Sequence, residues 1–173
     1  MPLTLKLLPP EDYEIFKRIR LEALRLAPAA FASSERDWAT LPDEEWQRRL
    51  KDNSVVVSFH EEEPVGIMGL MPQQPSKMAH RATIIMVYLR ENERGGGRAA
   101  AMLDLLLDHA RTLGVRQVEL AVSAENPAAF RFYLREGFHE IGRIPGGFLH
   151  EGREIDEIMM ARRLTLDNRL GSL

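Results

Sequence analysis

The feature that most constrains the fold is an uninterrupted apolar segment, ATIIMVYL, from Ala82 to Leu89. A short apolar run without polar alternation is typical of a strand that is covered on both faces. After a polar, glycine-rich stretch, apolar residues recur at three- and four-residue steps from about Gly97 to Leu113, which predicts an amphipathic helix. A second strand is predicted from Gln117 to Val122. Together these segments predict a strand–helix–strand crossover within a sheet that has helices on both faces.

The other segments extend this crossover into an α/β domain with a mixed sheet of about six to seven strands. Leu3, Leu5 and Leu7 alternate with polar residues and predict a short first strand that ends at Pro9-Pro10. The remaining predicted elements are a helix from Pro10 to Pro28, a helix from near Pro42 with Asp43 as its cap, a hairpin (Ser54 to His60 and Val65 to Met71, with its turn at 61–64), a helix from Asn126 to Glu136, and closing strands from Phe138 to Ile144 and from Glu154 to Ala161. We expect a single domain over residues 1–164 and a C-terminal tail over residues 165–173.

Composition excludes several classes of function. With 23 Lys and Arg against 26 Asp and Glu, the formal charge of -3 argues against binding to nucleic acid through bulk charge. No apolar run approaches the ~20 residues that a membrane span needs. The N-terminus lacks the apolar region of a signal peptide, so we expect a cytoplasmic protein. The absence of cysteine removes disulfides, thiolate nucleophiles and sulfur-ligated zinc, and the five histidines show no metal-ligand spacing.

The turn between the apolar strand and its helix is the most informative segment for function. It reads Arg94-Gly95-Gly96-Gly97-Arg98-Ala99, and its three glycines allow tight curvature with no Cβ in the way. Backbone N–H groups can then converge at the positive end of a helix, which is a setting that binds phosphate. Arg94 and Arg98 add positive charge. The same string also satisfies the loose dinucleotide pattern G-x-G-x-x-A, with Glu119 where a ribose-binding acid could stand, although that motif normally follows the first strand of its fold.

Two motifs carry a family resemblance that covers nearly the whole chain. Residues 94–99 match the pattern [QR]-x-x-G-x-[GA], and residues 126–138 match N-x-x-A-x-x-x-Y-x-x-x-G-F. Pro64-Val65-Gly66 in the hairpin and the segment from Asp156 to Met160 are similar as well. On these residues the chain resembles the GCN5-related N-acetyltransferase (GNAT) family, whose members bind acetyl-coenzyme A. The resemblance implies a mostly antiparallel sheet and acetyl-CoA as co-substrate.

The resemblance also assigns cofactor-binding residues. In the family, the strand before the phosphate loop diverges from its parallel neighbour, and pantetheine pairs with the free backbone much like an added strand. The N–H of Val87 would then polarise the thioester carbonyl and stabilise the oxyanion. Each residue also has an ordinary structural interpretation, since Val87 and Leu89 suit core packing and Asn126 suits a helix cap before Pro127. The implied cofactor-binding residues are Val87, Leu89, Arg94, Gly95, Gly96, Gly97, Arg98, Ala99 and Asn126.

The implied acid is Tyr133, which would protonate the departing thiolate, although its helical spacing equally suits a core aromatic. The base is less determined. Relatives carry a glutamate at the position of Ala121 or of Thr83, and this chain has neither. Glu119 lies two residues from Ala121, hence on the same strand face, and is the predicted substitute. His80 or a chain of waters would also serve.

We therefore predict an acetyl-CoA-dependent N-acetyltransferase in which a primary amine of a small molecule or peptide attacks the bound thioester directly. Contacts to the amine are expected from residues 26–46 and 144–154, where Phe31, Trp38 and Trp46 either line a pocket or anchor the core, and Glu35 or Asp37 could hold a cation. Two alternatives remain at this point, a non-catalytic acyl-CoA-binding sensor and a nicotinamide-binding oxidoreductase. A homodimer is plausible from the resemblance. No metal, nucleic acid or membrane partner is expected.

Overall fold

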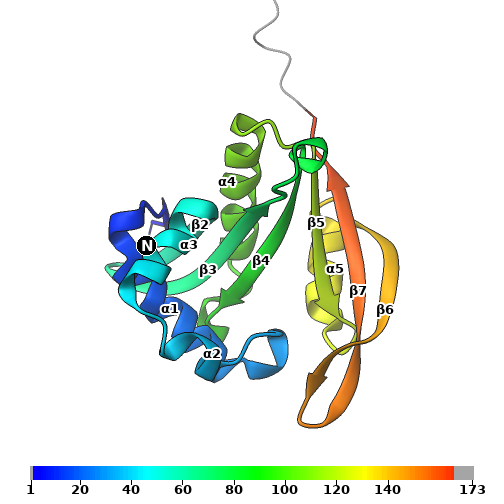
Figure 1. The fold of residues 1–173 in the computed structure, drawn as a ribbon, viewed down its shortest axis with the longest axis horizontal. Helices are drawn as coiled ribbons and strands as arrows, with labels where there is room; N and C mark the ends of the chain where they lie inside the picture. The colour runs from blue at the N-terminus through cyan, green and yellow to red at the C-terminus, as the bar shows by residue number, and fades with distance from the viewer. Residues whose placement is uncertain (1, 166–173) are drawn as a thin grey trace, which may run out of the picture.

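A single mixed sheet organises the computed structural model, which describes residues 2–165 (Figure 1). Its strands lie in the order β1-β2-β3-β4-β5-β7-β6. Every neighbouring pair is antiparallel except β4 and β5, which are parallel and joined through a helix. The predicted α/β fold with its mostly antiparallel sheet and its crossover is therefore confirmed. The strands are β1 (Thr4–Leu7), β2 (Ser54–His60), β3 (Glu63–Pro72), β4 (Arg81–Leu89), β5 (Gln117–Ser123), β6 (His139–His150) and β7 (Arg153–Arg163).

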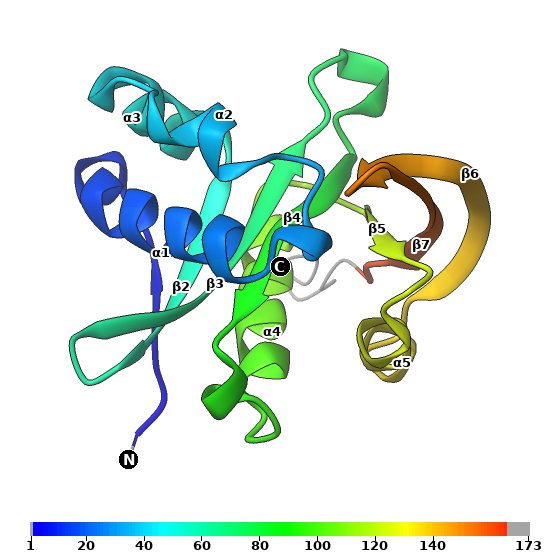
Figure 2. The ribbon, with the colours of Figure 1, turned by 90° about the horizontal axis from the view of Figure 1, so that it is seen from below.

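Helices cover both faces of the sheet, and both layers pack on β2, β3 and β4 (Figures 1 and 2). On one face, the apolar stripe of α4 packs with buried residues of β2 to β5 and of β7, in a core that also takes Tyr133 and Phe138. On the other face, residues of α1 and α3 pack on β2, β3 and β4 in a second core around Phe16 and Trp46. The helices are α1 (Tyr13–Leu26), α2 (Glu35–Ala39), α3 (Asp43–Asp52), α4 (Arg98–Thr112) and α5 (Pro127–Arg135).

A β-bulge in β4 changes which face its side chains meet. Met86 has a φ of 58°, and Met68 of β3 lies where two residues of β4 oppose one. Before the bulge, Ala82 and Ile84 belong to the α4 core, and after it Val87 and Leu89 do so. The bulge therefore shifts the two-residue alternation by one position, three residues beyond the last β4 residue that pairs with β5.

The structure differs from the sequence-based prediction at four places, each for a local reason. Helix α2 was not predicted, because it has only five residues and is held by a capping box between Ser34 and Asp37 rather than by an apolar stripe. Asp43 does not cap α3: Pro42 occupies that position, and the Asp43 carboxylate instead contacts Tyr13 and Lys17 of α1. The hairpin turn is shorter than predicted, since β3 already begins at Glu63.

The fourth difference lies between the last two strands, where a loop was expected from Ile144 to Glu154. These residues instead extend β6 and β7, which turn at Glu151 and Gly152. Pro145-Gly146-Gly147 has the composition of a turn, but Gly146 lies within β6 with a φ of 58° and donates its N–H to Asp156 Oδ1 at 2.9 Å. Of the predicted tail, residues 166–173 lie outside the described residues. No helix among residues 2–165 is long and apolar enough to cross a membrane.

Ion pairs fix α1 to the end of β4. Glu22 is buried and accepts hydrogen bonds from Arg90 Nε at 2.6 Å and Nη2 at 2.7 Å, and from the hydroxyl of Tyr88 at 3.2 Å. Arg90 also contacts Glu63 at 2.9 Å, and Glu63 contacts Arg18 at 2.6 Å. The Arg90 hydrogen bonds hold the pKa of Glu22 below its ordinary value, against the opposing effect of burial. The network fixes the point at which the glycine-rich turn leaves the sheet.

We predict that Glu22→Gln lowers the free energy of unfolding by about 1–3 kcal/mol at neutral pH, because Arg90 and Tyr88 lose a buried charged acceptor. Arg90 lowers the pKa of Glu22 below the ordinary value of 4.5. The stabilisation is therefore complete above that pH and is lost as pH falls through the lower pKa of the folded state. Urea unfolding at neutral and at acid pH should show a difference between wild type and variant that narrows in acid.

The matched control is Glu62→Gln, which removes a carboxylate from the exposed turn between β2 and β3. It should change the free energy of unfolding by less than about 0.5 kcal/mol. Equal effects of the two substitutions would show that the Glu22 network does not stabilise the fold.

Candidate functional site

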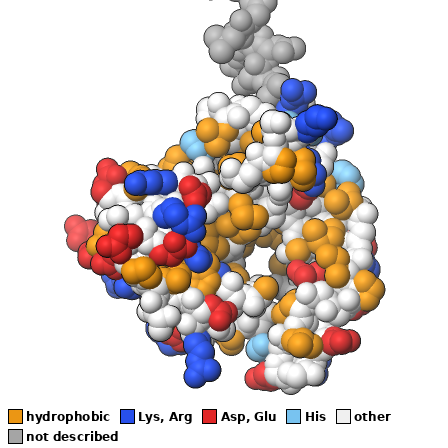
Figure 3. All heavy atoms as spheres, in the orientation of Figure 1, with side chains coloured by type: hydrophobic (Ala, Val, Ile, Leu, Met, Phe, Trp, Pro, Cys, Tyr) orange, Lys and Arg blue, Asp and Glu red, His pale blue; other side chains and the backbone are white. Residues whose placement is uncertain are grey.

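The two parallel strands pair only at one end. Arg81, Ala82 and Thr83 of β4 pair with Gln117, Val118 and Glu119 of β5. Beyond these residues β4 continues to Leu89 without a strand partner on this side, while β5 stays paired with β7 to Ser123. Figure 1 shows the strands diverging, and Figure 3 shows a hollow at this place, between the α1–α3 layer and the β5–β7–β6 side. A free strand edge that faces a hollow can pair with an extended ligand.

The glycine-rich turn lies beyond the end of β4 and opens into helix α4. Gly95 and Gly97 have φ values of 83° and 80°, which L-residues with side chains rarely adopt. Gly97 is the N-cap of α4, and no side chain of the described residues caps this helix. A Cβ at any of the three glycines would meet no atom within 4 Å in the described structure. The first N–H groups of a long helix are therefore open to a ligand, which is the arrangement that binds phosphate.

The two arginines of the turn brace it rather than project from it. Arg94 donates from Nε to the carbonyl oxygen of Leu89 at 2.9 Å. Arg98 donates from Nη1 to Ser58 Oγ and to the carbonyl oxygen of Phe59, each at 2.9 Å, and its Nη2 lies 3.0 Å from Glu93. Sequence reasoning placed Arg98 beside an anion. The structure adds that its guanidinium is already bonded, so its direct contribution to an anion is its backbone N–H. A pocket of about 260 Å³ lies beside the turn, lined by Leu3, Asn92, Glu93, Arg94, Gly96 and Arg98.

Helix α5 presents Asn126 and Tyr133 next to the parallel strands. Asn126 Oδ1 accepts a hydrogen bond from the N–H of Ala129 at 3.1 Å, so the helix-cap interpretation is confirmed. Tyr133 is buried between Phe132 and Phe138, with ring centroids 5.1 and 5.6 Å away. Its core interpretation is confirmed too. Burial raises the pKa of the Tyr133 phenol above its usual range, so the hydroxyl is protonated at neutral pH.

Glu119 lies at the closed end of the diverging pair and is 8% exposed. Both of its carboxylate oxygens accept hydrogen bonds from Arg81 Nε at 3.0 Å, and the pairing raises the pKa of Arg81. Thr83 is bonded to Gln73 at 3.3 Å, and His80 lies exposed just before β4. Glu119 therefore lies on the same strand face as Ala121, and its carboxylate is bonded to Arg81.

The aromatic residues of the first helices pack edge-to-face or tilted against one another. Trp46 is fully buried against Phe16, so of its two interpretations the core anchor is correct. The guanidinium of Arg20 lies between the rings of Phe31 and Trp38, 4.7 and 4.6 Å from their centroids. Arg20 is 3% exposed, and its Nε and Nη1 make no hydrogen bond within the described residues. Sequence reasoning missed this arginine, since its position on α1 carries no motif.

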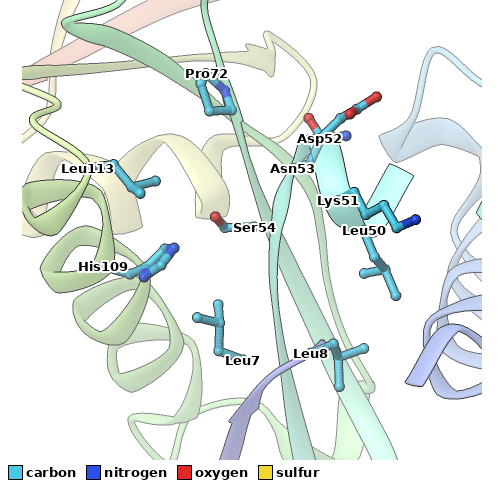
Figure 4. Close-up of a pocket in the computed structure, with 10 residues that line it drawn as sticks. All are labelled: Leu7, Leu8, Leu50, Lys51, Asp52, Asn53, Ser54, Pro72, His109 and Leu113. Atoms are coloured by element: carbon cyan, nitrogen blue, oxygen red, sulfur yellow. The ribbon is translucent and has the colours of Figure 1, made fainter. Parts of the chain in front are cut away.

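A second pocket, with a volume of about 390 Å³, lies outside the site predicted from the sequence (Figure 4). It opens between the ends of β1, α3 and α4. Ser54 and His109 face each other across it without a hydrogen bond. No residue predicted for the site lines this pocket, and metal-binding groups of His, Asp and Glu are absent from residues 2–165.

The fold and the site define a class of protein: an α/β domain with a split parallel pair and a helix N-terminus without a side-chain cap beside the split. The family model described as "Acetyltransferase (GNAT) family" matches residues 18–138. The chain therefore belongs to the GNAT family of acetyltransferases. The nicotinamide alternative is wrong at the level of the fold, because the glycine-rich turn follows the fourth strand of a mixed sheet and not the first strand of a doubly wound one.

Similarity to individual proteins is more distant. A spermidine N(1)-acetyltransferase of Vibrio cholerae is 26% identical over 115 residues, which is 66% of this chain and 66% of that protein. An L-methionine sulfoximine/L-methionine sulfone acetyltransferase of Pseudomonas aeruginosa is 32% identical over 81 residues, 47% of this chain and 46% of that protein. The chain thus spans less than two thirds of the length of these relatives.

Solved structures agree with the fold. An acetyltransferase of the GNAT family from Streptococcus pneumoniae superposes with a TM-score of 0.81 at 20% identity, over 94% of this chain and 100% of that one. A Salmonella typhimurium protein solved with its cofactor acetyl-CoA superposes with a TM-score of 0.78 at 21% identity, over 100% of this chain and 99% of that one.

We predict that Asn126→Ala lowers the free energy of unfolding by about 1 kcal/mol, because the N–H of Ala129 loses its cap. Asn126→Asp should keep the stability of the wild type, since aspartate caps helices equally well. Chemical denaturation measures both. Equal losses in the two variants would show that the Asn126 side chain stabilises the fold by something other than the cap.

Proposed function

We propose that the protein is an acetyl-CoA-dependent N-acetyltransferase that acts on a primary amine. The observation that carries this proposal is the free edge of β4 leading directly to the uncapped N-terminus of α4. An acyl-CoA is an extended, amide-bearing chain attached to a diphosphate, and its two parts match these two features in order. Membership of the GNAT family supports the same cofactor.

In the proposed complex the amides of pantetheine pair with the free backbone of β4 at Val87 and Leu89. The carbonyl of Leu89 already accepts from Arg94, so its second lone pair is the one available to the cofactor. The diphosphate takes the N–H groups of Gly95, Gly96, Gly97, Arg98 and Ala99, with Arg94 beside them. The N–H of Val87 donates to the thioester oxygen and stabilises the negative charge that develops there.

The reaction then needs one acid and one base. The amine nitrogen attacks the thioester carbon, a tetrahedral intermediate forms, and the carbon–sulfur bond breaks. We propose that Tyr133 donates its proton to the departing thiolate, a role that its raised pKa permits because the phenol is protonated at every relevant pH. Asn126 can cap α5 through its oxygen and still offer its amide N–H groups to the cofactor. Glu119 remains the sequence-based proposal for the base, although both of its oxygens already accept hydrogen bonds from Arg81.

The acceptor is proposed to be a small molecule, on the strength of the names of the Vibrio and Pseudomonas relatives. A peptide amine is the alternative. We further propose a cytoplasmic protein without nucleic acid or membrane partners. A homodimer would most simply form at β6, which is a free edge of the sheet and carries exposed Ile141, Ile144 and Leu149.

A non-catalytic acyl-CoA-binding sensor is the second candidate, favoured by the engagement of Glu119 with Arg81. Acetyl-CoA is incubated with a panel of primary amines, and thiol release is followed. Release that depends on the amine supports the enzyme. Cofactor binding by calorimetry with no release on any amine would support the sensor.

We predict that Gly97→Val weakens coenzyme A binding about tenfold or more, because a β-branched residue resists the left-handed conformation and the strain displaces the N–H groups. Isothermal calorimetry measures the affinity. The control is Gly152→Val in the turn between β6 and β7, where φ is 75° and a Cβ likewise meets nothing within 4 Å in the described structure. Gly152→Val imposes the same backbone strain outside the glycine-rich turn, so the affinity for coenzyme A should not change. Equal losses at both glycines would remove the phosphate-loop assignment.

We predict that Tyr133→Phe lowers kcat about 100-fold while the affinity for coenzyme A is kept, because only the proton donor is lost. Tyr13→Phe removes a hydroxyl from the exposed part of α1 and serves as the control. Steady-state kinetics with a saturating amine separate the two parameters. Full turnover by the Tyr133 variant would exclude this residue as the acid.

A further inference from the structure

The face of β5 and β7 that α4 and α5 leave free forms one wall of the hollow. Val118, Leu120 and Val122 point into the α4 core, so the alternate residues Glu119, Ala121 and Ser123 point to the opposite face. The second core, under α1 and α3, takes residues of β2, β3 and β4 and none of β5 or β7 among the described residues. Ala121 is accordingly exposed. This uncovered face is where an amine would approach a thioester held between β4 and β5.

The strand register places one further carboxylate on this face. In the β5–β7 pairing, Glu119 lies opposite Ala161, Ala121 opposite Met159, and Ser123 opposite Glu157. Residues directly opposite in an antiparallel pair share a face, so Glu157 stands diagonally next to Ala121. Ile158 and Met160, which flank it by one and three positions, point into the α4 core and confirm the alternation.

Glu157 is half-buried and is not engaged by a partner. Within residues 2–165 its carboxylate makes no hydrogen bond and no ion pair. Its side chain lies over Gly147 of β6, where a Cβ would come within 2.5 Å of Oε1 and 2.7 Å of Cγ. A side chain at position 147 would therefore collide with the Glu157 carboxylate, and the glycine leaves room for it.

Among the charged groups around Glu157, Glu154 makes no hydrogen bond or ion pair within the described residues, and the others named here are engaged by partners. On the same face, Glu119 is bonded to Arg81. Beyond the end of β5, Glu125 is paired with Arg153 at 2.8 Å. On β6, Arg143 is paired with Glu140 at 2.9 Å. On β7, Asp156 accepts the N–H of Gly146, and Glu154 lies against the same glycine.

We propose that Glu157 is the proton acceptor for the amine substrate, a role that rests on the proposed acetyltransferase function. The ammonium gives one proton to the Glu157 carboxylate, directly or through one water. The neutral nitrogen then forms its bond to the thioester carbon, the carbon–sulfur bond breaks, and the thiolate takes a proton from Tyr133. The nitrogen loses its second proton to the phenolate. Products are the acetamide, the free thiol and protonated Glu157, which returns its proton to solvent.

The test is a pH–rate profile of Glu157→Gln, which keeps the shape of the side chain and removes its basicity. Thiol release is followed with saturating acetyl-CoA and an aliphatic primary amine, for which the wild type is active, between about pH 6.5 and 9.5. We expect kcat/KM for the amine to fall about 100-fold at neutral pH, and the deficit to shrink as pH rises, because the amine then loses its proton to solvent. Coenzyme A affinity should not change. A purely structural role would give a deficit that is independent of pH.

Two further variants sharpen the result. Gly147→Ala keeps the carboxylate but displaces it, so an intermediate loss of kcat/KM is expected. Glu140→Gln removes an exposed carboxylate of β6, which is paired with Arg143, and should leave the pH profile of the wild type. A Glu157→Gln enzyme with the wild-type rate and profile would overturn the proposal, as would transfer of the pH effect to Glu119→Gln. If the wild type binds acetyl-CoA but none of the amines tested causes thiol release, the proposed function itself fails. The role of Glu157 then fails with it.

Discussion

The short pairing between β4 and β5 is the constraint on which the rest of the site depends. Only residues 81–83 and 117–119 form the parallel ladder, and a free edge begins immediately after it. Two features accompany this separation. Beyond Thr83, β4 bends at the Met86 bulge, while β5 stays paired with β7 as far as Ser123. If β4 and β5 were paired along their whole length, no strand edge would be free to pair with an extended ligand. The glycine-rich turn would then not lie beside such an edge.

Charge pairing keeps this open geometry rigid. Glu22 and Arg90 hold the end of β4 to α1, and Arg98 holds the start of α4 to β2. Between these two contacts the turn carries no side chain from Gly95 to Gly97, and both of its ends are held by ion pairs or hydrogen bonds. The arginines that looked like anion ligands in the sequence thus act mainly as braces, and backbone dipoles are left to meet the anion.

The fold was predictable because its signals are local. The apolar run of β4, the amphipathic period of α4 and the two family motifs lie within short windows, and their order alone determines the crossover. What failed were features set by tertiary contacts. The helix at Glu35–Ala39 is too short for a periodic signal, and Pro145-Gly146-Gly147 has the composition of a turn although it lies within a strand. Arg20 carries no signal at all, because its burial depends on rings that lie 11 and 18 residues further along the chain.

The carboxylate proposed as the base illustrates the same limit. A single strand shows only that Glu119 shares a face with Ala121, and that reasoning is correct. It cannot show that Arg81, far away in the sequence, engages both oxygens of Glu119, nor that β7 pairs with β5 in the register that places Glu157 opposite Ser123. Register across strands is decided by the whole sheet, and a shift of one residue would turn Glu157 into the α4 core. In the proposed mechanism, Glu157 of β7 therefore takes the place of the carboxylate that β5 lacks at Ala121. A proton acceptor has to lie beside the amine in the hollow, and any strand that reaches the hollow can supply it.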